Sequence, residues 1–441
     1  MNTQLHQLKT QIQQTQLIKR VGLVTQVYGL LIESDGPNVF IGEQVEIYST
    51  GSNETVLAEV IGIKNNKVLM MPYGQVDGIR YGSEVIGTGH DVTIPLNLSL
   101  LGRVIDAFGN PIDGKGALNQ ANRQSTNAMP LNPLTRPVID SQIETGIKAI
   151  DTTIPLGKGQ RIGLFAGSGV GKSTLMSMIA KNVDAEINVI ALIGERGREV
   201  REFIEHHLSE EALSRSVIVV ATSDTSALMR KQSALTATRI AEWFRAEGND
   251  VSLMMDSITR YAMALREISL SNGEPPSSRG YTPSTFSALP KLLERAGTHD
   301  SGGSITGIYT VLVEGDDFNE PISDLIRATV DGHVVLSREI AERGQYPAIN
   351  ILKSESRVKN SVASKERNSQ ASVLRRLISL YEESRDLIEI GAYKAGANKE
   401  LDFAVSNWGS IQDFLSQDSD ASFNCNEAFK QLHAVVGHYE K

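Results

Sequence analysis

The chain has 441 residues, more than one compact domain of about 100–200 residues holds, so several domains are expected. Apolar residues make up 40% and charged residues 22% of the sequence, a balance that excludes wholesale disorder. A net charge of −9 gives no general footprint for nucleic acid, so we expect nucleotide and protein partners. Cys425 is the single cysteine, which excludes an internal disulfide and a cysteine cluster for zinc.

The sequence contains no stretch that approaches the roughly 18 consecutive apolar residues of a membrane helix. Its polar start, MNTQLHQLKTQIQQTQ, also lacks the apolar segment of a signal peptide. We therefore expect a cytoplasmic protein.

Residues 1–19 form a glutamine-rich segment with apolar side chains loosely at helical spacing, at Leu5, Leu8, Ile12 and Leu17. This spacing favours a short amphipathic helix, and a frayed polar terminus explains it equally well. Residues 20–90 contain short β-rich runs, VGLVTQV, GLLIES, EQVEIYS, VLAEVIGI and KVLMMPY, separated by turn signals such as Asn-Asn. Such runs predict a small antiparallel barrel or sandwich.

Residues 91–357 contain LLGRVIDAFGNPIDG, a proline-rich connector MPLNPLTRP, and then apolar runs that alternate with helical patterns. The strands predicted from these runs are 161–166, 187–193, 216–221, 251–255 and 305–313. Alternation of this kind predicts an α/β domain with a parallel sheet and crossover helices. Strand signals stop near Ser361, and apolar residues three and four apart in SVLRRLISLYEESRDLIEIGAYK predict a helical domain over residues 358–441.

The segment RIGLFAGSGVGKSTLMSMIAKN joins an apolar strand to a helix through a glycine-rich turn, which is the context of a phosphate-binding loop. The glycines allow backbone N–H groups to converge on phosphate oxygens, and the helix N-terminus adds a favourable dipole. We expect Lys172 to reach the β- and γ-phosphates of ATP and Ser173 to bind Mg²⁺. Thr174 begins the helix beside the phosphates. The nucleotide-binding set is Gly167, Ser168, Gly169, Val170, Gly171, Lys172, Ser173 and Thr174.

Ala166 occupies the position of the usual first glycine, a mild departure because that residue closes the strand. The alternative to a phosphate loop is a chance glycine-rich turn before a helix, which this context makes improbable.

Two carboxylates complete the predicted chemistry. Asp256 ends the apolar run VSLMMD, where a parallel sheet delivers it to the ligand crevice as a second Mg²⁺ ligand, although such an aspartate often only caps the next helix. Glu195, directly after the strand in NVIALIGERGREV, is the predicted catalytic base, and Arg196 and Arg198 follow it. A solvated cluster of surface charges is the alternative for this segment.

Several segments together resemble the family of rotary and protein-export ATPases: LLGRVIDAFGNPIDG, TGIKAIDTTIPLGKGQRIGLFAGSGVGKST, IGERGREV, MDSITRYAMA, EPPSSRGYTPSTFSALPKLLERAG and GQYPAI. The resemblance covers residues 20 to 420, and FAGSGVGKST with LPKLLERAG is most similar to the flagellar protein-export branch. It implies an N-terminal β-barrel, a central RecA-type P-loop domain, a C-terminal helical domain and a homohexameric ring with ATP between subunits.

The resemblance also implies roles for individual residues. Glu195 matches the catalytic carboxylate, Arg196 its phosphate-side neighbour and Asp256 the Walker-B acid, while Arg260 matches a γ-phosphate contact. Noncatalytic subunits of the family carry glutamine at the position of Glu195, so a glutamate implies a catalytic subunit. Two assignments come from the resemblance alone: Arg357 matches an arginine finger supplied to the neighbouring subunit's nucleotide, and Tyr346 matches the aromatic that stacks on adenine. Without the family, a surface cation and a half-buried loop aromatic explain these two residues.

The implied partners are a regulatory stator-like protein at the N-terminus, stalk and export-gate proteins, and export chaperone–substrate complexes. The implied location is the cytoplasm, peripherally at the inner face of the cytoplasmic membrane. The leading hypothesis is ATP hydrolysis for flagellar protein export by a type III secretion apparatus.

Four alternatives stay open at this point. A catalytic subunit of a rotary ATP synthase and an injection-type secretion ATPase share the motifs. A Rho-like RNA translocase would need a basic, aromatic-rich barrel, and residues 21–88 contain few Lys or Arg. A non-enzymatic nucleotide-binding ring subunit is the fourth alternative, and Glu195 argues against it.

Overall fold

The computed structural model describes residues 21–49, 55–300, 302–313, 315, 317–396, 398–437 and 439. The predicted N-terminal amphipathic helix lies outside these residues. The chain divides into two compact units: the first is built around a β-barrel, and the second contains a large sheet and the C-terminal helices. Within the described ranges, no helix combines the length and the apolar content needed to cross a membrane.

The first unit is a closed antiparallel barrel with the strand order β1-β2-β5-β4-β3-β6. Its strands are β1 (Val21–Tyr28), β2 (Leu31–Asp35), β3 (Gln44–Tyr48), β4 (Thr55–Lys64), β5 (Lys67–Pro72) and β6 (Glu84–Gly87). Asn65 and Asn66 both have positive φ angles, 51° and 64°, which suits the tight hairpin between β4 and β5. The predicted β-rich region is therefore a barrel and not a sandwich, and β6, which sequence reasoning missed, closes it.

Val45 and Ile47 illustrate why these residues form a barrel. Both are fully buried, while their neighbours along β3 are only half-buried. This alternation matches the two-residue period of a strand with one face on a core.

The second unit is built on a nine-stranded sheet with the strand order β19-β18-β12-β17-β15-β13-β14-β8, and β16 pairs with β17. Strands β8 to β18 along this path are parallel, whereas β16 and β19 are antiparallel. The strands are β8 (Arg103–Ile105), β12 (Arg161–Ala166), β13 (Ile187–Ile193), β14 (Ser216–Ala221), β15 (Asp250–Asp256), β16 (Gly297–Thr298), β17 (Ser304–Leu312), β18 (Gly332–Val335) and β19 (Glu355–Ser356).

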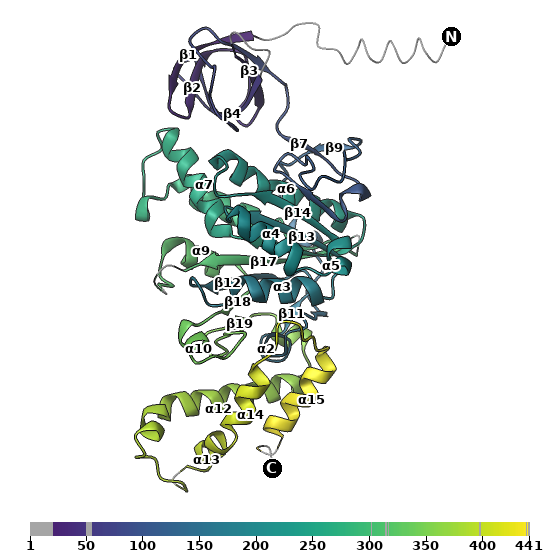
Figure 1. Ribbon diagram of the computed structural model, residues 1–441, viewed down its shortest axis with the longest axis vertical. Helices are drawn as coiled ribbons and strands as arrows, with labels where there is room; N and C mark the ends of the chain where they lie inside the picture. The colour runs from purple at the N-terminus through teal and green to yellow at the C-terminus, as the bar shows by residue number, and fades with distance from the viewer. Residues whose placement is uncertain are drawn as a thin grey trace, which may run out of the picture. The chain divides into compact units, whose positions relative to one another are not determined.

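Helices cover both faces of this sheet, so each face has its own core (Figure 1). One core contains Leu164 of β12 and Leu175 of α3, and the other contains Phe165 of β12 and Phe244 of α6. The helices of this region are α3 (Lys172–Asn182), α4 (Gly197–His206), α5 (Glu210–Ser214), α6 (Ala227–Ala246), α7 (Ile258–Ser271), α8 (Pro283–Leu293), α9 (Pro321–Thr329) and α10 (Arg338–Glu342). Burial on both faces explains why the predicted strands are continuous apolar runs.

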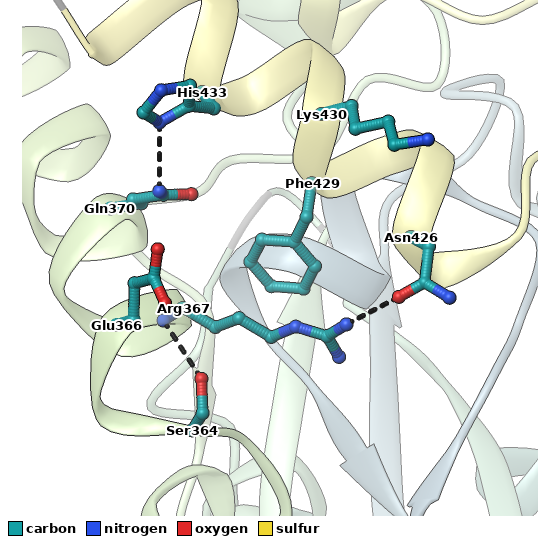
Figure 2. A pocket seen from close by; sticks show the side chains of 8 residues that line it. All are labelled: Ser364, Glu366, Arg367, Gln370, Asn426, Phe429, Lys430 and His433. Atoms are coloured by element: carbon teal, nitrogen blue, oxygen red, sulfur yellow. Dashed lines mark hydrogen bonds between the residues drawn. The ribbon is translucent and has the colours of Figure 1, made fainter.

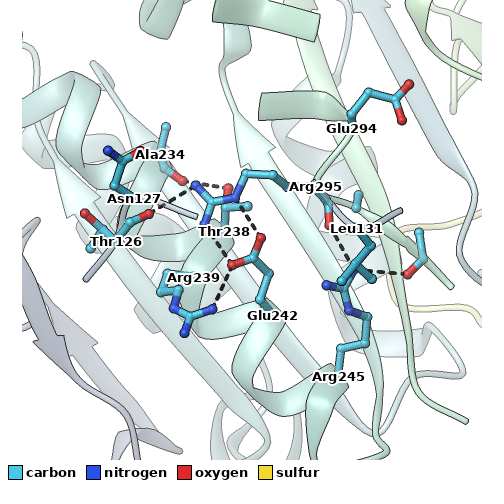
Figure 3. A network of polar contacts seen from close by, with 12 residues as sticks. Thr126, Asn127, Leu131, Ala234, Thr238, Arg239, Glu242, Arg245, Glu294 and Arg295 are labelled. Atoms are coloured by element: carbon cyan, nitrogen blue, oxygen red, sulfur yellow. Dashed lines mark hydrogen bonds and ion pairs between the residues drawn. The ribbon is translucent and has the colours of Figure 1, made fainter. Parts of the chain in front are cut away.

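The segment that leads into the sheet contains short elements only. They are β7 (Thr93–Pro95), β9 (Arg123–Ser125), β10 (Gln142–Ile143), β11 (Leu156–Gly157), α2 (Lys148–Thr153) and the 3₁₀ turns Leu98–Leu100 and Pro133–Thr135. Buried arginines attach part of this segment to the domain (Figure 3). Arg295 donates to both carboxylate oxygens of Glu242 on α6, at 2.7 and 2.8 Å, and to the carbonyl of Thr126 at 3.1 Å.

The C-terminal helices pack against α2 in the second unit (Figure 1). Leu374, Ile411 and Leu432 are fully buried in a core that also contains Ile150 of α2. The helices are α11 (Lys359–Val362), α12 (Lys365–Glu389), α13 (Lys399–Ser406), α14 (Trp408–Leu415) and α15 (Cys425–Val436). The predicted fold class is confirmed, while the domain bounds at 90/91 and 357/358 stay predictions.

Candidate active site

The glycine-rich loop lies between β12 and α3, as the sequence predicts. Gly169 and Gly171 have φ angles of 78° and 89°, in the left-handed region that only glycine adopts easily. Gly171 is the N-cap of α3 and provides no side-chain hydrogen bond. The first N–H groups of α3 therefore have no acceptor within the helix, and together with the dipole they form an anion-binding site.

A cavity of about 750 Å³ opens over this loop. Its volume is within the range of small-molecule sites, about 300–1,000 Å³. The loop residues that line it are Gly167, Ser168, Gly169, Gly171, Lys172, Ser173 and Thr174. Val170 does not line it, because this side chain is buried below the loop at 2% exposure.

Lys172 contacts the two predicted acidic residues. Its Nζ forms an ion pair with Asp256 and lies 3.5 Å from Oε1 of Glu195. Asp256 also accepts a 2.6 Å hydrogen bond from the Thr310 hydroxyl of the neighbouring strand β17. The backbone N–H of Arg260 reaches the Ser257 hydroxyl at 3.3 Å, so Ser257 and not Asp256 takes the capping role at α7.

Burial raises the pKa of Glu195. The ammonium of Lys172 opposes this shift, while the nearby carboxylates of Asp256 and Glu199 raise the pKa further. A carboxylate with a raised pKa in a cavity is suited to accept a proton near neutral pH.

The two arginines that follow Glu195 closely in the sequence are both exposed. Arg196 and Arg198 are 77% and 78% exposed and form ion pairs with Glu199 and Glu202 on α4. The alternative of a solvated charge cluster therefore describes these two pairs, although Arg196 also borders the cavity.

Arg260 also lines the cavity, from α7. The backbone of Gly194 approaches it so closely that a Cβ at Gly194 would lie 3.0 Å from its Cγ. Within the described part of the chain, its buried Nε has no hydrogen-bond partner. An unsatisfied buried donor is costly, so a ligand oxygen at this position would be stabilising.

Besides Val170, three predicted residues do not line this cavity: Asp256, which is 6% exposed, Tyr346 and Arg357. Tyr346 is 48% exposed, and its ring lies beside Gly171, 3.5 Å from where a Cβ there would stand. Arg357 follows β19 and is exposed, with its N–H bonded to the carbonyl of Asp331 and its guanidinium to that of Arg327 at 3.4 Å.

Sequence reasoning missed several cavity residues. Ser223 and Val313 follow β14 and β17, and the rule that carboxyl ends of parallel strands converge on a ligand would have found both. Met263 and Arg338 come from α7 and α10, and no sequence signal separates them from other helical residues.

The donors present suit a hard divalent cation such as Mg²⁺. Ser173 offers a hydroxyl and Asp256 a carboxylate, which are oxygen ligands of the kind that Mg²⁺ prefers. The ion pair of Asp256 with the Lys172 ammonium shows that this carboxylate attracts a positive charge. The described residues contain no group of three or more His, Cys, Asp or Glu placed to hold a metal. This is compatible with Mg²⁺, which takes few protein ligands and keeps water or phosphate oxygens.

Three family models match three separate ranges of this chain. The ATP synthase alpha/beta family nucleotide-binding domain matches residues 146–356, and its beta-barrel domain matches residues 24–89. The T3SS EscN ATPase C-terminal domain matches residues 363–434. The flagellum-specific ATP synthase of Bacillus subtilis is 50% identical over 97% of this chain and 98% of its own length. The chain belongs to the flagellar and type III secretion ATPase family.

Type III secretion system ATPases, the second branch of this family, are also similar to this chain. The type 3 secretion system ATPase of Xanthomonas euvesicatoria is 45% identical over 91% of each chain. The structure of the assembled ATPase EscN from enteropathogenic E. coli has a TM-score of 0.90 and 44% identity, over 94% of this chain and all of that one. A structure of EscN in complex with its central stalk EscO has a TM-score of 0.87 and 43% identity over the same shares of the two chains. Membership in this family establishes the protein as an ATP-hydrolysing enzyme, as the sequence predicts.

Proposed function

We propose that this ATPase drives or assists the export of flagellar proteins through a type III secretion apparatus. The observation that carries the catalytic part is the position of Lys172, between the carboxylates of Asp256 and Glu195 at the start of α3. A single ammonium that holds two acids at a phosphate loop can exchange these partners for the phosphates of ATP.

The residues of the chain divide the work. The loop N–H groups and Lys172 bind the β- and γ-phosphates, and Arg260 turns its unsatisfied donor toward the γ-phosphate. Glu195, with its raised pKa, accepts a proton from the attacking water, while Arg196 stands on the phosphate side of it. Ser173 and Asp256 would hold Mg²⁺, which when bound neutralises phosphate charge.

The complete site is proposed to form between subunits of a homohexamer. Arg357 is exposed and lies outside its own subunit's cavity, as a finger that serves a neighbour must be. Such a finger stabilises charge on the γ-phosphate only when the ring closes, which makes turnover dependent on assembly. Tyr346 stacks on adenine in this proposal. The related EscN has been solved in its assembled form, which supports the ring.

The proposed partners and cellular location follow from the relatives and from the sequence. A central stalk protein is proposed as a partner because EscN binds EscO. A stator-like regulator at residues 1–19, export-gate proteins and chaperone–substrate complexes are the other proposed partners. The proposed location is cytoplasmic, at the inner face of the cytoplasmic membrane, without nucleic acid.

A matched pair of variants tests the catalytic part. Glu195→Gln should keep ATP binding and lose turnover by about a thousandfold, because the general base is gone. Glu202→Gln is the control, since this glutamate is on the outer face of α4 and 47% exposed. Phosphate release would be measured for both variants, and equal rates would reject Glu195 as the base.

Secretion by the source organism tests the biological part. In cells that lack this chain, the wild-type protein should restore flagellar proteins in the medium, and Glu195→Gln should restore fewer. Recovery of an injection-type system without flagellar secretion would transfer the assignment to that branch of the family.

A further inference from the structure

A second cavity, of about 550 Å³, lies among the C-terminal helices where α12 and α15 begin (Figure 2). It shares no lining residue with the cavity over the phosphate loop. Residues that line it from the two sides are Ser364, Glu366 and Arg367, and Asn426, Phe429 and Lys430. We call this cavity the α12/α15 groove.

Arg367 is held in place at the groove. Its guanidinium lies over the ring of Phe429, 4.5 Å from the centroid. One Nη donates to Oδ1 of Asn426 at 2.7 Å and the other to Sγ of Cys425 at 3.4 Å. A guanidinium fixed in this way loses little further freedom when it binds a ligand.

In the part of the chain that the structure describes, the two cations of the groove form no ion pair with the one carboxylate that lines it, Glu366. Neither Arg367 nor Lys430 has an ion-pair partner among the residues that the structure describes. By contrast, Arg376 and Arg385 farther along α12 pair with glutamates, at 2.6 and 2.9 Å. The acidic groups close to the groove are Glu366, which lines it, and Glu144, which accepts the N–H of Cys425 at 3.0 Å. The charge of Asp151 also acts on Cys425, and Glu427 in the first turn of α15 is bonded to Asn424.

Polar groups complete the groove. Gln370 is 7% exposed, and its Nε2 lies 3.1 Å from Nδ1 of His433. Figure 2 shows this pair on one side of Phe429, and the charged ends of Arg367 and Lys430 on the other side with Asn426. A lining of this kind does not suit an apolar helix, whereas it offers several hydrogen-bond donors to an anion.

We propose that the α12/α15 groove binds an acidic peptide segment of a partner protein, with Arg367 and Lys430 pairing with its carboxylates. The planar guanidinium fork matches carboxylate geometry, and Lys430 adds a point charge. The volume exceeds that of a single ion and accommodates a short stretch of chain. The whole chain has a net charge of −9, so its overall charge repels an acidic partner. Binding of such a partner therefore needs a local cationic site like this groove.

Peptide binding to the full-length protein tests the proposal. The probe is a fluorescent peptide of alternating aspartate and glycine, and its neutral counterpart has asparagine in place of aspartate. The acidic peptide should bind, and added salt should weaken the binding. Arg367→Gln with Lys430→Gln should weaken it by about tenfold or more. The control of equal charge change is Arg376→Gln with Arg385→Gln, for which less than about a twofold change is expected.

Several results would overturn the proposal. Equal affinity for the neutral peptide, or equal losses in the two double variants, would show that the groove does not recognise carboxylates. Tight binding of inorganic phosphate without binding of the acidic peptide would assign the cations to a phosphate-bearing ligand instead. Lys430→Gln alone should still weaken binding, which guards against misfolding caused by loss of the Arg367 stacking. ATP turnover should be unchanged in every variant, so failure here leaves the proposed ATPase mechanism untouched.

Discussion

Lys172 contacts two carboxylates that have separate proposed tasks. Its ion pair with Asp256 neutralises a buried acid, and its 3.5 Å approach to Glu195 lowers the pKa that burial raises. When ATP phosphates attract the ammonium, both acids lose this partner. Nucleotide binding and the basicity of Glu195 are therefore linked through one side chain.

The raised pKa of Glu195 predicts a particular pH dependence. A general base works only when ionised, so kcat/KM should fall as the pH drops through the raised pKa, at higher pH than for an ordinary glutamate. The carboxylate of Glu199 contributes to raising this pKa. Glu199→Gln should therefore move the acid limb of the profile to lower pH, whereas Glu202→Gln should not move it. A profile that is the same in all three proteins would contradict this account of Glu195.

At the residue scale, sequence reasoning succeeded where a backbone shape requires particular residues. The positive φ angles of Gly169 and Gly171 leave little alternative to glycine, so the loop could be recognised from its letters. Arg338 reaches the same cavity from a helix that begins more than 150 residues later, and only the tertiary fold brings it there. The proposed roles of Arg357 and Tyr346 stay predictions.

At the scale of elements, strand length decided what could be predicted. The buried strands β12, β13, β14, β15 and β17 have six to nine residues each and read as apolar runs. β8 has three residues and β18 has four, too few for a period to be recognised. Both join the sheet because neighbouring strands provide hydrogen-bonding partners, a tertiary effect.

The network around Arg295 stabilises the connection between elements (Figure 3). The side chains of Arg295 and Glu242 are 3% and 6% exposed, and Arg245 donates to the carbonyl of Arg295 at 2.9 Å. Burial lowers the pKa of Arg245 to about 10. Arg136 reaches the carbonyl of Ala296 at 3.0 Å, so arginine donors satisfy the carbonyls that follow α8.

Removal of Arg295 should therefore be severe. Arg295→Ala leaves the carboxylate of Glu242 buried without its two-point partner, although Arg239 and the charge of Arg245 stay near it. We expect a loss of about 3–5 kcal/mol in the free energy of unfolding. The control is Arg376→Ala, because its ion pair with Glu400 is exposed and should contribute less than about 1 kcal/mol. Urea denaturation would measure both, and similar losses would show that burial does not govern the contribution of Arg295.

At the scale of the whole molecule, the three regions have different sequence signatures. Short alternating runs give the barrel, continuous apolar runs give the sheet, and spacings of three and four give the C-terminal helices. The barrel has its own core, while the sheet and the C-terminal helices share one of the two cores of the second unit. Because every region has elements that face a core, each keeps a regular apolar spacing, and the order of the regions could be predicted from that spacing. Ring assembly could not, because an interface patch on a monomer differs little in composition from other surface.

Mixed rings test whether the active site is shared between subunits. Subunits with Glu195→Gln lack the base and keep Arg357, whereas subunits with Arg357→Ala keep the base and lack the finger. Neither protein alone should turn over ATP. If the finger acts on the neighbour, random mixing in equal amounts should restore about a quarter of the sites, since half of the subunits keep the base and half of those receive a finger.

A second mixture provides the control for this complementation. Glu195→Gln and Lys172→Ala both damage the cavity of their own subunit, so no arrangement in a ring joins an intact cavity to an intact finger. This mixture should stay inactive at every ratio. Recovery in the control would show that mixing restores turnover without an intact cavity, so recovery in the first mixture would not support a shared site. No recovery in the Glu195→Gln and Arg357→Ala mixture, despite ring formation by light scattering, would exclude a finger supplied by the neighbouring subunit. The finger position in the sequence would then be a surface cation, and each cavity would have to hydrolyse ATP with the residues of its own chain.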